Sequence, residues 1–243
     1  RFAVLVGADQ NDMMERANLG VLLEAANAPD SKLGRALTQA MTHAADVTFK
    51  DVVREACLSR EHFMAWSDSA GSIDVAMVQV ARTLGVNPDE RLEDIDREIL
   101  DGPYLPRSEW VNAAATLDTG TSNDVKQANR LSEAVAKAGD EQIASYLSLF
   151  LTDKLEPRKS LVTKNISATY PSFADRLSRE QERLLALLEK RRAIVQRDRT
   201  RALLTIASAV ATNYRQEKQA RGLLDYDDLI DKTLEMLNSV SAG

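Results

Sequence analysis

The longest helical pattern in this 243-residue chain lies between Pro171 and Gly222, a stretch with no internal glycine or proline. Apolar side chains recur at helical spacing along it, from Phe173 to Tyr214. The pattern predicts one helix of about fifty residues, which would span roughly 75 Å. The polar run Gln196–Arg201 interrupts the apolar stripe, so the helix is expected either to bend or to cross solvent there. No strict heptad persists, which argues against a coiled-coil dimer.

Most of the remaining sequence is also expected to be helical. Glycine (10) and proline (6) are scarce, while Ala, Leu, Glu and Arg dominate. We therefore predict an all-α, multi-helix domain with one very long helix near the C-terminus. Residues 1–243 are taken as a single domain, with an acidic helical lobe (1–150) and a long-helix lobe (151–243) as its sub-lobes. Only the short apolar piece at residues 1–6 is a candidate strand, and no apolar run approaches the length of a membrane span.

The sequence lacks the patterns of the common catalytic and metal sites. The lone Cys57 excludes a disulfide framework and a cysteine zinc site, and suits a reducing cytoplasm. His43 and His62 have no evident set of partner ligands, so metal binding is not favoured. No glycine begins a GxxxxGKS/T phosphate loop, and GxSxG, HExxH and GxGxxG are absent. We expect no catalytic residue, no metal site and no cofactor in this chain.

The net charge of −6 conceals a strong asymmetry along the chain. Residues 1–153 carry −11, residues 154–221 carry +9, and residues 222–243 carry −4. A basic block inside an acidic protein is a candidate nucleic-acid surface, because clustered cations attract the phosphate backbone. The alternative is a solvated long helix of mixed charge.

Basic side chains are concentrated in the irregular stretch 152–160 and along the long helix. Exposed cations on a loop bind phosphate readily and carry no base information. The alternative for this stretch is an ordinary solvated hairpin between helices. The candidate DNA contacts are Lys154, Arg158, Lys159 and Lys164 and, on the long helix, Arg191, Arg192 and Arg197.

A tight corner between two helices is predicted at the end of the long helix. We predict that Gly222 is the left-handed C-cap of the long helix and that Asp225 is the N-cap of a final helix. Asp227 and Asp228 then lie in its first turn, where the helix dipole favours acids. Capping explains these acids better than a metal site, since consecutive helical positions point in different directions. The apolar face of the final helix comprises Leu224, Leu229, Ile230, Leu234 and Leu237.

The same corner carries a family resemblance. Leu224-Asp225-Tyr226-Asp227-Asp228-Leu229 resembles the "LDF-x-DL" segment of superfamily 1 DNA helicases of the UvrD/Rep type, where it follows a helix bearing a tyrosine and a lysine. Tyr214 and Lys218 match those two positions. Segments from Leu149 to Lys164 are similar to one branch, the AddA subunit of the AddAB helicase–nuclease. The family-motif residues are Tyr214, Lys218, Gly222, Leu224, Asp225, Tyr226, Asp228 and Leu229.

The resemblance implies a helical accessory subdomain, called 1B, inserted in the first RecA-like motor domain. The phosphate-loop lysine would precede residue 1, the Walker B strand would follow residue 243, and a nuclease domain would lie further downstream. The parent would be an ATP- and Mg-dependent DNA helicase and exonuclease (a hydrolase) of double-strand-break repair and recombination in the bacterial cytoplasm, acting at the nucleoid. Its implied partners are DNA at single-strand/duplex junctions, the motor domains and an AddB-like subunit, with no membrane.

Two other functions stay open at this stage. The chain could be a non-catalytic scaffold that docks the motor domains or a partner subunit without binding DNA, a role that the acidic N-terminal half favours. It could also be a free-standing helical interaction protein in which the match to the helicase segment is accidental.

Overall fold

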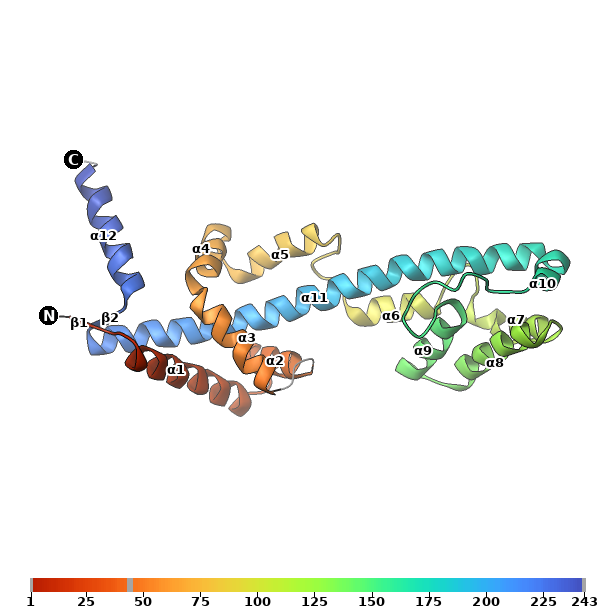
Figure 1. Ribbon diagram of the computed structural model, residues 1–243, viewed down its shortest axis with the longest axis horizontal. Coiled ribbons are helices and arrows are strands. Elements are labelled where there is room, and N and C mark those ends of the chain that lie inside the picture. The colour runs from red at the N-terminus through yellow and green to blue at the C-terminus, as the bar shows by residue number, and fades with distance from the viewer. Residues whose placement is uncertain (1, 43–45, 242–243) are drawn as a thin grey trace. The chain divides into compact units, whose positions relative to one another are not determined.

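The computed structural model describes residues 2–42 and 46–241, and 78% of the structure is helical, which confirms the all-α fold. Figure 1 shows the order of the elements. The described elements are β1 (Ala3–Val4), α1 (Ala8–Asn27), α2 (Lys32–Met41), α3 (Asp46–Leu58), α4 (Arg60–Ala70), α5 (Ile73–Thr83), α6 (Leu92–Leu100), η1 (Arg107–Glu109), α7 (Trp110–Asp118), α8 (Ser122–Ala136), α9 (Gly139–Phe150), α10 (Lys164–Thr169), α11 (Pro171–Arg221), β2 (Leu223–Leu224) and α12 (Tyr226–Ser241).

The chain forms two compact units. One, which we call the discontinuous unit, combines Arg1–Val80 with Gln196–Gly243, and the other, the inserted unit, is Ala81–Val195. The division by packing therefore differs from the charge-based division at residue 150, because the sign of surface charge does not report which side chains pack together. That the whole chain acts as one accessory domain stays a prediction.

The expected long helix is present as α11, with 51 residues. It remains helical through Gln196–Arg201, the polar run that left its continuity open. Arg197 is buried there, and the next buried residue along α11 is Ala202, five residues further on. The helix thus buries an arginine where the sequence pattern alone indicates a gap in burial.

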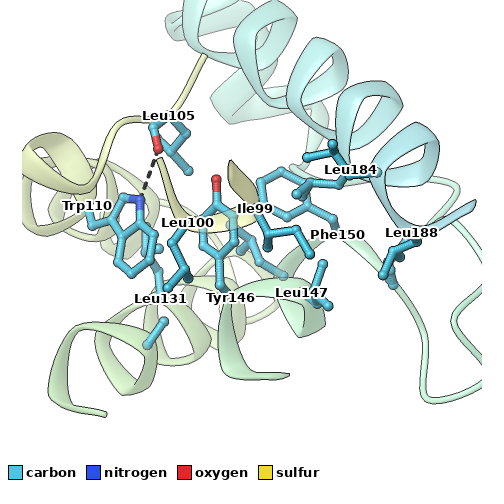
Figure 2. Close-up of a cluster of buried hydrophobic side chains, with 14 of the residues drawn as sticks. Ile99, Leu100, Leu105, Trp110, Leu131, Tyr146, Leu147, Phe150, Leu184 and Leu188 are labelled. Carbon is cyan, nitrogen blue, oxygen red and sulfur yellow. Dashed lines mark hydrogen bonds between the residues drawn. The ribbon is translucent and has the colours of Figure 1, made fainter. Parts of the chain in front are cut away.

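An aromatic cluster forms the core of the inserted unit (Figure 2). The rings of Trp110 and Tyr146 stack with centroids 4.5 Å apart, and Phe150 meets Tyr146 edge-on at 5.3 Å. Trp110 Nε1 donates to the carbonyl of Leu105 at 3.0 Å, so the indole is both buried and satisfied. These contacts fasten α7 and α9 to the loop that follows α6.

A buried carboxylate joins this core to the first part of α11. Glu180 is fully buried and accepts hydrogen bonds from Tyr146 Oη at 2.7 Å and from Arg183 at 2.6 Å. Arg183 also donates to the carbonyls of Glu98 and Ile99, at the C-terminal end of α6. Burial, and then the charge of Glu180, raise the pKa of Tyr146 above its ordinary value.

The discontinuous unit has its own core, in which α1, α2 and α3 pack with the last part of α11. Along α1, Met13, Ala17 and Val21 recur every four residues on one face and are buried. On α11, Ile206 and Val210 belong to the same cluster. The unit therefore follows the usual packing of amphipathic helices around an apolar stripe.

Candidate nucleic-acid interface

The irregular basic stretch between α9 and α10 forms a hairpin. Leu151 and Pro157 form an antiparallel bridge, and the Thr152 amide donates to the Glu156 carbonyl at 2.8 Å. Leu155 lies at the tip with φ of 59°, a left-handed conformation that leucine rarely adopts. Lys154 is exposed beside it. The stretch thus has the hairpin geometry that was considered as the alternative.

Two glutamine side chains fix the base of this hairpin. Gln127 Nε2, from α8, donates to the carbonyls of Leu149 and Leu161 at 3.1 and 3.4 Å. Gln181 Nε2, from α11, donates to the carbonyls of Phe150 and Arg158 at 2.7 and 3.1 Å. The backbone that carries Arg158 is therefore held in place from two helices.

Beside the hairpin lies a cationic pocket of about 330 Å³, between α8 and residues 158–163. Its cations are Lys126, Arg130 and Arg158. Arg158 Nε donates to the Ser148 carbonyl at 3.1 Å, and Arg130 Nη1 donates to Gln127 Oε1 at 2.7 Å. Partial burial and then the nearby charge of Arg130 lower the pKa of Arg158, while Asp153 opposes the shift. Because Arg130 and Arg158 line the same pocket, their like charges repel each other.

One carboxylate lines the cationic pocket, and its hydrogen bonds are already made. Asp124 is 1% exposed and accepts from the amide and hydroxyl of Thr121 and from the amide and hydroxyl of Thr163, at 2.7–3.1 Å. Burial alone would raise the pKa of Asp124, but these donors, led by the Thr163 hydroxyl, lower it. Asp124 therefore joins the start of α8 to the start of α10.

The structure separates the seven candidate DNA contacts into two sets. Arg158 lines the cationic pocket, and Lys154, Lys159 and Lys164 are exposed, with no ion pair to any other described residue. The three arginines of α11 all have carboxylate neighbours. Arg191 pairs with Asp96 at 2.8 Å, Arg192 with Glu189 at 2.6 Å, and the buried Arg197 with Asp198 at 2.7 Å.

Sequence reasoning missed two cations of this site, Lys126 and Arg130. They lie on α8, which was expected as a helix but not as part of the interface. A weak signal existed, because positions four apart on a helix share one face. Their proximity to Arg158 comes from tertiary packing across the hairpin, which no local pattern encodes.

The family-motif residues form a second charged cluster, the Asp225 corner, in the discontinuous unit. Asp225 is fully buried and accepts from Tyr214 Oη at 2.9 Å, Lys218 Nζ at 2.8 Å and Arg60 Nη2 at 3.1 Å. Asp225 Oδ1 also accepts from the Asp228 amide, and Asp228 Oδ2 accepts from the Asp225 amide, which makes a reciprocal capping box. The predicted N-cap role of Asp225 is thus confirmed.

The electrostatics of the Asp225 corner favour the ionised carboxylate. Burial would raise the pKa of Asp225, but the hydrogen bond and charge of Lys218, the Asp228 amide and the Tyr214 hydroxyl together lower it to about 2. The pKa of Tyr214 is raised, by burial first and then by Asp225. Cations and hydrogen-bond donors thus compensate the buried charge of Asp225. These interactions stabilise the turn between α11 and α12.

The backbone of the corner also follows the predicted turn. α11 ends at Arg221, and Gly222 has φ of 64°, the left-handed C-cap conformation. Leu223 and Leu224 then pair in parallel with Ala3 and Val4. Of the candidate strand at residues 1–6, only Ala3 and Val4 form a strand, and its partner lies far along the sequence.

The final helix leaves much of its apolar face open. On α12 the exposed fractions are 59% for Ile230, 52% for Leu234 and 61% for Leu237, whereas Leu229 is half-buried. Leu224, expected on the same face, lies in β2 and is also half-buried. On and beside β1, Phe2, Val4 and Val6 are 45–64% exposed. The described residues therefore leave two sets of apolar side chains exposed, one on α12 and one on and beside β1.

The described residues show neither a metal centre nor a membrane span. No group of three or more His, Cys, Asp or Glu side chains among them is arranged to hold a metal ion, and His43 lies outside the described residues. None of the helices searched there has the length and hydropathy to cross a bilayer. Cys57 is buried, which raises the pKa of its thiol to about 11 despite the nearby Arg60.

Comparison with known proteins leaves the family open, since no protein-family model, no curated protein and no solved structure matches this chain.

Proposed function

We propose that this chain is a DNA-contacting accessory domain of an ATP-dependent helicase–nuclease subunit of the AddA type. In that role it would hold DNA at a single-strand/duplex junction by phosphate contacts. ATP and Mg would be used by the motor domains of the same protein, in the bacterial cytoplasm, and an AddB-like subunit would be the partner. The family part of the proposal rests on the resemblance at Leu149–Lys164 and Tyr214–Leu229.

The observation that carries DNA contact is the excess of positive charge at one fixed place. Lys126, Arg130 and Arg158 share the cationic pocket with a single carboxylate, Asp124, whose hydrogen bonds are already made. Exposed lysines follow on the hairpin and just beyond it. Cations that lack a carboxylate partner bind polyanions by releasing counterions, and they show little sequence preference.

Fluorescence anisotropy with a forked DNA at two salt concentrations tests this proposal. We expect salt-sensitive binding that the double variant Arg158→Glu/Lys159→Glu weakens by at least about tenfold at low salt. The matched control is Arg97→Glu/Arg179→Glu, which makes the same charge change at two exposed arginines of the inserted unit that pair with Asp94 and Asp175. If the control variant binds DNA as weakly as the double variant does, the loss of affinity reflects net charge and not these two residues. Absence of binding by the wild type at low salt would refute DNA contact.

A second function, docking without DNA binding, is favoured by the open apolar face of α12. Parallel strands are nearly always covered on both faces, yet β1 keeps Val4 45% exposed. The occupant we propose is the α/β motor domain of the same protein, whose sheet and helices would cover these side chains. Ile230→Ser/Leu234→Ser in the full-length protein should then lower ATPase activity and leave the unfolding midpoint of the 243-residue chain unchanged. Unchanged ATPase activity would exclude this docking role.

A further inference from the structure

We infer that the cationic pocket is a binding site for one phosphate group, with Arg130 and Arg158 as its principal ligands and Lys126 as a third cation. The inference deepens the proposed function, on which it rests for DNA as the source of the phosphate. A free phosphate or nucleotide presents the same chemistry.

The two guanidinium groups provide the main argument. Arg130 and Arg158 come from different elements, α8 and the hairpin, and line one pocket. Arg158 is anchored through Nε to the Ser148 carbonyl, and Arg130 through Nη1 to Gln127. Each anchor uses only part of the guanidinium, so further N–H donors of both side chains are available toward the pocket. An anion seated between them would offset their mutual repulsion.

The fixed surroundings explain why the site would be ready before the ligand arrives. Gln127 and Gln181 hold the backbone on either side of the hairpin, and Asp124 holds Thr163 against α8. Ligand binding would therefore require little ordering of the loop, which reduces the entropy lost on association.

The chemistry of the donors selects phosphate over other ligands. Asp124 already occupies amide and hydroxyl donors at the start of α8, so recognition has to come from side-chain cations. Planar guanidinium forks match the paired oxygens of a phosphate, and three cations against one carboxylate suit a ligand of one or two negative charges. Asn123 and Ser160 add neutral polar groups to the lining.

Titration with inorganic phosphate, followed by NMR shifts at constant ionic strength with chloride as the replaced anion, tests the site. We expect saturable shifts at Lys126, Arg130 and Arg158 and about a tenfold or greater loss of affinity in Arg130→Gln. Lys126→Gln should lose less, because an ammonium contributes a single point of charge. Arg97→Gln on α6 is the matched control and should bind phosphate as the wild type does.

The same variants with forked DNA separate the two sources of phosphate. If Arg130→Gln weakens both phosphate and DNA binding, the pocket takes a backbone phosphate. If it weakens phosphate binding alone, the pocket binds a free anion. DNA contact would then depend on Lys154, Lys159 and Lys164 and not on the pocket. Phosphate shifts that are absent, or equal in wild type and Arg130→Gln when both have the same unfolding midpoint, would overturn the inference.

Discussion

The Asp225 corner and the cationic pocket both gather charged side chains, but they differ in how their charges are matched. At the corner, Arg60 and Lys218 face Asp225, Asp227 and Asp228, and the buried carboxylate receives donors from α4 and α11. In the pocket, three cations face one carboxylate that is bonded to threonines. A charged cluster whose partners are internal stabilises the fold, whereas one with excess charge is suited to bind a ligand.

The largest expected effect breaks the corner. Asp225→Asn keeps the shape and the N-cap ability of the side chain but removes its charge, so Lys218 and Arg60 lose their buried partner. We expect a loss of about 3–5 kcal/mol in the free energy of unfolding, measured by urea denaturation. The control is Asp227→Asn, whose side chain is 40% exposed and should lose less than about 1 kcal/mol. Equal losses in both variants would remove the distinction between buried and exposed partners.

The second effect is the pH dependence of the same corner. The folded pKa of Asp225, about 2, lies below its ordinary value of 3.8, so ionised Asp225 stabilises the folded state above about pH 4. That contribution, on the order of 2 kcal/mol, should disappear as the pH falls from about 4 through 2. The difference in urea midpoint between wild type and Asp225→Asn should therefore become smaller as the pH falls across this range. If the difference in urea midpoint is the same at every pH, the titration of Asp225 is not coupled to folding.

A smaller effect is expected at the tip of the hairpin. Leu155 adopts φ of 59°, which glycine tolerates without a Cβ penalty. Leu155→Gly should raise the free energy of unfolding by about 0.5 kcal/mol, after allowing for the greater freedom of glycine in the unfolded chain. Thermal unfolding would measure the change, and Leu155→Ala, which keeps the strain, should not gain. Phosphate affinity should be the same in both, since the tip does not line the pocket.

The smallest expected effect is on stability at the cationic pocket. Arg130→Gln removes one of two repelling guanidinium groups and one hydrogen bond to Gln127, so the free energy of unfolding should change by less than about 0.5 kcal/mol. The same substitution should have a large effect on phosphate binding. A loss of stability comparable with that of Asp225→Asn would mean that the pocket, like the corner, serves the fold.

The sequence predicted the features that depend on neighbours along the chain. Gly222 and Asp225 carry local capping signals, and both adopt the expected roles. The absence of glycine and proline after Pro171 predicted α11, although the buried Arg197 within its polar run could not be foreseen, because burial depends on the helices packed around it.

Features that depend on distant residues were not predicted. Arg191 lies 95 positions from its partner Asp96, and the pairing of β1 with β2 joins segments more than 200 residues apart. Lys126 and Arg130 belong to the same class, since only the folded hairpin brings Arg158 to α8. Charge composition located the basic region of the chain but not the residues that share a pocket.

The parallel pairing of β1 with β2 has a topological consequence. Val4 lies opposite Leu224, so the polypeptide between them departs from and returns to neighbouring positions on one small sheet. Such a closed excursion can lengthen, shorten or acquire a further insertion while the strand pair keeps its geometry, because its entry and exit points stay fixed. Ala81–Val195 is itself one contiguous insertion in the sequence of the discontinuous unit. The segment between β1 and β2 therefore contains a second, nested insertion.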